Sequence, residues 1–277
     1  MRIRKLKIED REQAAGLWLS IFGDSEAFTS WYFTERFCPE HSFAAFDGDL
    51  LVAMTLGRPT CISIAGETLD ALLISGVSTL PEYRGRGLMH GLVGMQIDHA
   101  KQNGFSCCYL HPVSESLYTS LGFRNGTDAL RIHSDPQRQH APFLLSEKTD
   151  VAAMQAVYDE LLLKHDGMQL RDEKEWRLLL EDYAADGLHI MIAYADRRPV
   201  GYVCYQDDGS VPELFALCSE AYEQLLGEAA NRMDLQLSAI VPTDCGVPGE
   251  RVYSMQYLVF DNSFSLPLRN GFCRLTY

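Results

Sequence analysis

Hydrophobic and polar positions along the chain alternate between helical and strand-like periods, and they predict an α/β protein. In the first half, Asp47-Gly48-Asp49 separates two apolar runs and is typical of a β-hairpin turn. The expected elements of this half are two helices over 9–37, strands at 42–46, 50–54 and 68–79, a helix at 86–102, a strand at 105–110, a short helix at 112–120 and a strand at 128–133.

The second half repeats this order of elements after a polar, proline-containing stretch at 134–150. The expected elements are helices at 151–164 and 172–183, a hairpin of strands at 190–194 and 200–205, an apolar segment at 211–217, a helix at 219–233 and a strand at 235–241. A repeated order of elements is the signature of an internal duplication. We therefore expect two domains, 1–138 and 139–277.

One segment of the first half points to a ligand. The apolar run ending at Thr79 is followed by a proline, by the turn Arg84-Gly85-Arg86-Gly87 and at once by a helical pattern. A strand, a glycine-rich turn and a helix N-terminus place several backbone N–H groups around a phosphate, and the arginines add charge-assisted hydrogen bonds. The turn lacks the Gly-Lys-Ser/Thr of a P-loop and the third glycine of a dinucleotide fingerprint. It therefore predicts a different phosphorylated ligand.

The corresponding point of the second half reads Cys218-Ser219-Glu220-Ala221. It has no glycine-rich turn, and an acidic residue there would repel a phosphate. We therefore expect one active site, in the first domain.

Two motifs resemble those of a known family. Arg84-x-x-Gly87, with the preceding strand, resembles the pyrophosphate-binding motif of the GNAT N-acetyltransferases. The segment from Leu117 to Phe123, which contains Tyr118, resembles a second motif of that family. The resemblance implies an α/β (α+β) fold of two GNAT-like units, each with a mixed, mostly antiparallel central sheet flanked by helices.

Met89 stands where the wider superfamily has glycine or alanine, and this variant resembles the enhanced-intracellular-survival (Eis) branch. Members of that branch pack two GNAT-like units in one chain, which agrees with the duplication. They also carry a sterol-carrier-like domain, for which we expect 277 residues to be too few.

The resemblance implies acetyl-CoA as the co-substrate. The main chain of the strand before the turn would pair with its pantetheine arm, the turn would surround its pyrophosphate, and His111 would line the thiol pocket. The implied acetyl-CoA-binding residues are Val77, Ser78, Thr79, Arg84, Gly85, Arg86, Gly87, Leu88, Met89 and His111.

The implied reaction is direct attack of a primary amine on the thioester, with Tyr118 as the general acid that protonates the leaving thiolate. The base is not identified by the sequence. Asp70 is one candidate, and the carboxylate of Tyr277 is another because the chain end reaches the active site in Eis-like proteins. Two other functions stay open: a non-catalytic acyl-CoA-binding or sensor protein, and a tandem-GNAT aminoacyl transferase.

The formal net charge of −14 argues against a nucleic-acid partner. It is compatible with a cationic amine acceptor, either a small molecule or a peptide, and equally with a simple role in solubility. The eight cysteines form no CxxC pair, which favours a reducing cytoplasm and no metal site. No apolar run is long enough for a membrane span, and the N-terminus lacks the apolar core of a signal peptide. A homo-oligomer is not excluded.

Overall fold

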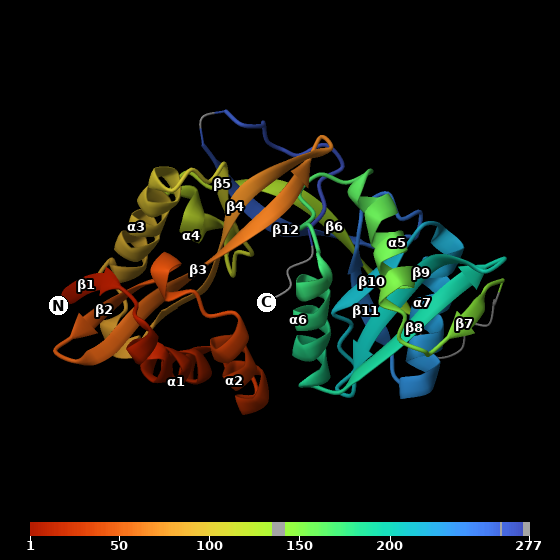
Figure 1. Ribbon diagram of the computed structural model, residues 1–277, viewed down its shortest axis with the longest axis horizontal. Coiled ribbons are helices and arrows are strands. Elements are labelled where there is room, and N and C mark those ends of the chain that lie inside the picture. Colours follow the sequence, from red (N-terminus) through yellow and green to blue (C-terminus); the bar gives the residue numbers. More distant parts are fainter. Residues whose placement is uncertain (135–141, 261, 274–277) are drawn as a thin grey trace.

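The structure, a computed structural model, describes residues 1–134, 142–260 and 262–273, with only the backbone of residues 253 and 254. Helices flank two sheets (Figure 1), so the expected α/β class with mostly antiparallel sheets is confirmed. The strands and longer helices are β1 (Arg2–Lys5), α1 (Arg11–Phe22), α2 (Glu26–Glu35), β2 (Phe43–Asp47), β3 (Leu50–Ile64), β4 (Glu67–Thr79), α3 (Leu88–Gln102), β5 (Cys107–Leu110), α4 (Glu115–Thr119), β6 (Arg124–Ser134), β7 (Leu144–Ser146), α5 (Val151–Leu162), α6 (Glu173–Ala184), β8 (Leu188–Ala195), β9 (Arg198–Gln206), β10 (Glu213–Ala216), α7 (Ser219–Met233), β11 (Leu237–Val241) and β12 (Glu250–Val259).

The larger sheet draws strands from both halves of the chain. Its order is β1-β2-β3-β4-β5-β12-β6-β11, and the smaller sheet has the order β10-β9-β8-β7. β12 of the C-terminal half pairs with β5, while β6 of the N-terminal half pairs with β11, so the two halves exchange their last strands. The expected boundary between residues 138 and 139 lies outside the described residues, and the division into two domains stays a prediction.

β3 is much longer than the pattern of hydrophobic positions predicted. β2 pairs with β3 only as far as Thr55, and the backbone of residues 167–170 hydrogen-bonds to β3 only from Cys61 onward. Pro59 therefore lies at a local edge, with β4 as its partner strand. A proline is tolerated at such an edge, which explains why Pro59 lies inside the strand. Gly57 is required by close packing, because a Cβ atom there would lie 2.3 Å from the carbonyl oxygen of His41.

Helix α3 covers the part of the large sheet that carries the glycine-rich turn. Its apolar stripe of Val93, Ile97 and Ala100 is buried against residues of β4 and β5, as the helical periodicity predicted. This packing fixes the direction in which the N-terminus of α3 points. None of the helices in the described ranges is both long and apolar enough to cross a membrane.

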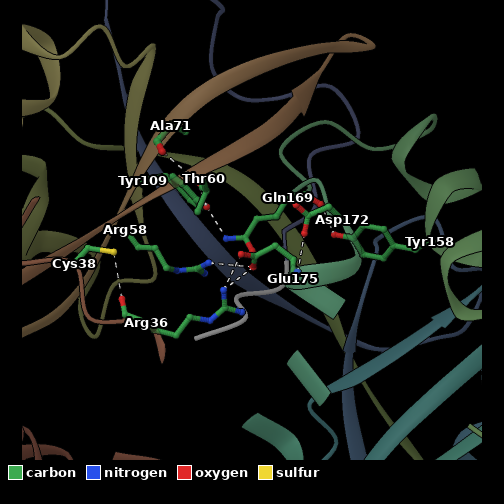
Figure 2. A network of polar contacts seen from close by, with 10 residues as sticks. All are labelled: Arg36, Cys38, Arg58, Thr60, Ala71, Tyr109, Tyr158, Gln169, Asp172 and Glu175. Atoms are coloured by element: carbon green, nitrogen blue, oxygen red, sulfur yellow. Dashed lines mark hydrogen bonds and ion pairs between the residues drawn. The ribbon is translucent and has the colours of Figure 1, made fainter. Parts of the chain in front are cut away.

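Polar side chains connect the two halves where α2 and α6 face each other (Figures 1 and 2). Arg36, directly after α2, donates to both carboxylate oxygens of Glu175 on α6 at 2.8 and 2.7 Å, and Arg58 of β3 lies 3.4 Å from the same group. Nearby, the amide of Gln169 donates to the Tyr109 hydroxyl at 2.6 Å. Both arginine side chains are almost fully buried, so the halves share one charged interface.

Candidate active site

The glycine-rich turn between β4 and α3 leaves its backbone accessible. Gly85 and Gly87 have φ angles of +75° and +74°, and a Cβ atom at either position would meet no atom within 4 Å. The hollow beside the turn has a volume of about 180 Å³. Because α3 begins at Leu88, its first N–H groups have no partner within the helix and are available to an anion here.

The turn carries two exposed arginines, of which Arg84 lines the hollow, and both donate hydrogen bonds to nearby backbone carbonyl groups. Arg84 donates from Nε to the carbonyl oxygen of Thr79 at 3.2 Å. Arg86 donates from Nη2 to the carbonyl oxygen of Glu82 at 2.9 Å, and its guanidinium lies 4.8 Å from the centre of the Tyr83 ring. The two positive charges and the helix N-terminus together favour a pyrophosphate.

Strands β4 and β5 separate just before the turn. They pair in parallel only from Ala71 to Leu73 of β4, although β4 continues to Thr79. The register between β3 and β4 shifts between Met54 and Leu56, where Gly76 of β4 adopts a φ of +56°. A Cβ atom at Gly76 would lie 2.8 Å from the ring of Trp18, so only glycine fits. The separation leaves the last part of β4 with no described strand on its β5 side.

A cleft of about 540 Å³ lies beside the separated strands, and both halves of the chain line it. The N-terminal half contributes residues of α1, β4 and α4, among them Val77 and Tyr118. The C-terminal half contributes the end of α6 and the loop before β10, among them Asp182 and Val211. The cleft therefore exists only when both halves are in place.

Comparison with known protein families identifies the N-terminal half. Residues 2–126 match the family model described as "Acetyltransferase (GNAT) domain". This half is a GNAT acetyltransferase domain. The protein is accordingly an acyltransferase, and the glycine-rich turn lies inside the matched GNAT region. A search of curated proteins finds no match to the chain.

Solved structures share the fold over nearly the whole chain, at low sequence identity. A probable N-acyltransferase from Enterococcus faecalis has a TM-score of 0.74 at 17% identity, covering 93% of this chain and 72% of that one. Eis1 from Mycobacterium abscessus has a TM-score of 0.69 at 17% identity, covering 94% and 74%. N-myristoyltransferase from Saccharomyces cerevisiae, solved with myristoyl-CoA, has a TM-score of 0.63 at 9% identity, covering 98% and 88%. The similarity extends beyond the GNAT domain into the second half.

Tyr118 occupies a buried position in the cleft of the GNAT domain. The residue lies on α4, is 6% exposed and packs edge-on against Phe123. Burial raises the pKa of its phenol above the usual value. Among the described residues its hydroxyl makes no hydrogen bond. The group is therefore protonated at neutral pH and free to donate to a ligand.

The remaining predicted residues differ in location. Val77 and His111 line the same cleft as Tyr118, whereas Thr79 and the turn apart from Arg86 line the smaller hollow, and Ser78 lines neither. Asp70 is exposed near the opposite end of β4 and does not line the cleft, so its suggested role as the base is wrong. Tyr277 lies outside the described residues.

Asp182 is the residue of this cleft that the sequence did not point to. It lies on α6 of the C-terminal half, is 6% exposed and lines the cleft opposite the GNAT domain. An aspartate in an amphipathic helix carries no motif, so only the packing of the two halves brings it to the site. Over the described part of the chain, no group of three or more His, Cys, Asp or Glu side chains could hold a metal ion.

Proposed function

We propose that the protein is an Eis-like N-acetyltransferase, which transfers the acetyl group of acetyl-CoA to a primary amine bound in the cleft. One observation carries this proposal: the hollow at the turn and the cleft both border the end of β4, where that strand has no described neighbour on its β5 side. Thr79 lines the hollow at the turn, and Val77 lines the cleft. A long co-substrate placed along this strand has its phosphates at the turn and its reactive end in the cleft.

The residues present fit such a co-substrate. The stretch of β4 from Gly76 to Thr79, which has no described strand on its β5 side, suits the amides of a pantetheine arm, and the open turn between Arg84 and Met89 suits a pyrophosphate. When bound, acetyl-CoA supplies a thioester whose carbonyl carbon accepts an amine.

Tyr118 is the proposed proton donor in this reaction. Its buried phenol stays protonated at neutral pH and has no partner among the described residues, so it is available to the departing thiolate. Direct attack by the amine needs no nucleophile from the enzyme. The carboxylate of Tyr277 remains a candidate for accepting a proton from the amine.

Three features support the remaining parts of the proposal. The fold similarity to Eis1 and the presence of Met89 support the Eis-like assignment. The net charge of −14 supports a cationic acceptor, a small molecule or a peptide. All eight cysteines are free thiols, which supports a cytoplasmic location.

The test is release of free thiol from acetyl-CoA in the presence of a panel of primary amines, with longer acyl-CoAs as parallel arms. The proposal expects amine-dependent thiol release and a matching N-acetyl product by mass spectrometry. Tight binding of acetyl-CoA without thiol release from any amine would instead identify a sensor protein.

A further inference from the structure

We propose that Asp182, on α6 in the C-terminal half, is the carboxylate that binds the ammonium group of the acceptor and takes its proton. This inference rests on the proposed function and adds two elements to it, a base and a substrate class. It also assigns a chemical task to the half of the chain that lacks a glycine-rich turn.

The position of Asp182 is unusual for a structural carboxylate. It is 6% exposed and lines the cleft, yet its side chain makes no hydrogen bond and no ion pair with any described residue. Buried polar groups are almost always hydrogen-bonded, because burial of an unpartnered carboxylate is costly. An unpartnered carboxylate at the wall of a cleft is complementary to a cation that enters it.

Two further aspartates lie at the same cleft, but both are exposed and have partners. Asp24 accepts a hydrogen bond from Trp18 Nε1 at 2.7 Å, and Asp186 accepts one from the Ser25 hydroxyl at 3.1 Å. Burial raises the pKa of Asp182 to about 7, and the negative charges of Asp186 and Asp24 act in the same direction. They also make the approach to the cleft attractive to a cation.

The positive charges near Asp182 form no ion pair with it, although Nε and Nη2 of Arg36 have no hydrogen-bond partner among the described residues. Arg36 and Arg58 lower its pKa, but both guanidinium groups lie against Glu175. They leave the carboxylate of Asp182 without an ion pair of its own. A carboxylate with a pKa near neutrality exchanges protons readily at the pH of the reaction, as a general base must.

The proton transfers balance. The ammonium group gives one proton to Asp182, and the resulting amine forms a C–N bond with the thioester carbonyl carbon as the C–S bond breaks. The thiolate takes the proton of Tyr118, and the second nitrogen proton returns to the Tyr118 oxygen. Asp182 then releases its proton to solvent, so both side chains regain their starting states.

The lining of the cleft indicates which amines fit. Aromatic rings line the same cleft as the carboxylate, and such rings favour apolar groups and organic cations. These rings belong to Trp18, Phe22, Phe28, Tyr118 and Tyr183. The acceptor is therefore a primary alkylamine carried on an apolar or aromatic body.

The test compares wild type, Asp182→Asn and Glu181→Gln with two acceptors of similar shape. 2-Phenylethylamine is protonated at neutral pH, whereas benzhydrazide is neutral there and needs no base before attack. Glu181 precedes Asp182 on α6 but is exposed and pairs with Arg177, so its variant is a matched charge control. Calorimetric binding of acetyl-CoA verifies that each variant is folded.

We expect Asp182→Asn to lower kcat/KM for 2-phenylethylamine about 100-fold, the usual worth of a general base, and that for benzhydrazide less than tenfold. In wild type, kcat/KM for 2-phenylethylamine should level off above about pH 7, where Asp182 is ionised. In Asp182→Asn, kcat/KM should keep rising with pH, in parallel with the fraction of unprotonated amine. Glu181→Gln should behave as wild type.

Equal activity and equal pH profiles of wild type and Asp182→Asn would overturn the inference while leaving the proposed function standing. If no amine releases thiol from the wild type, the proposed function fails, and calorimetric binding of 2-phenylethylamine then decides the inference. At least tenfold weaker amine binding to Asp182→Asn supports the ammonium site, and unchanged or absent binding overturns it.

Discussion

Replacing Asp182 by asparagine should stabilise the protein at alkaline pH, because the buried carboxylate makes ionisation costly. Burial raises its pKa from 3.8 to about 7 in the folded protein. The folded state therefore binds more protons than the unfolded state between these pH values, and stability falls as the pH rises through this range. Complete ionisation at pH 9 costs up to about 4 kcal/mol, since each pKa unit corresponds to about 1.4 kcal/mol.

This cost should disappear in Asp182→Asn, whose side chain is nearly isosteric and never ionises. Its unfolding free energy should exceed that of the wild type by about 2–4 kcal/mol at pH 9 and differ by less than about 1 kcal/mol at pH 4. Urea denaturation followed by tryptophan fluorescence is a suitable assay, because Trp18 and Trp176 are both buried. Glu181→Gln again serves as the control.

A constant stability difference between the two proteins from pH 4 to pH 9 would refute this reasoning. It would show that the carboxylate ionises in the folded state as readily as in water, with no cost from burial. Destabilisation by asparagine at pH 9 would refute it too, by showing that the charge has a partner that stabilises it.

Four further outcomes follow from the site and the interface. Tyr118→Phe should lower kcat for thiol release about 100-fold, as loss of a general acid does, with unchanged acetyl-CoA affinity by calorimetry. Arg84→Ala should weaken acetyl-CoA binding by about 1–3 kcal/mol in the same assay, and unaltered affinity would point to another ligand. Glu175→Gln should lower the unfolding free energy by about 3 kcal/mol in urea, because it leaves Arg36 buried without its counter-charge. Deletion of 140–277 should give a fragment that aggregates in light scattering, since β5 loses its partner β12; a well-behaved monomer would contradict this.

Local patterns predicted much of the fold. The helix over Leu88–Gln102 and the hairpin around Gly48 depend on periodicity and turn residues that lie close together in the sequence. The end of β3 was missed because Gly57 and Pro59 are poor strand residues, and only the surrounding packing makes them suitable there.

The candidate site likewise contains residues that the sequence pointed to and residues that it missed. The turn from Arg84 to Gly87 and the segment around Tyr118 are contiguous motifs, so the sequence pointed to them directly. Asp182 has no local signal, because its proximity to the cleft depends on how α6 packs against the N-terminal half. Asp70 was suggested for its place on β4, and the structure puts it far from Tyr118 because a strand advances about 3.3 Å per residue.

The exchange of last strands between the two halves has a consequence for synthesis on the ribosome. β5, whose end borders the cleft, acquires its second neighbour only when β12, more than a hundred residues further along the chain, has emerged. Until then the nascent acyl-transfer half presents an open sheet edge, which is prone to mispairing and aggregation. Activity therefore cannot precede the synthesis of β12, and the timing of folding is governed by contacts between residues more than a hundred positions apart.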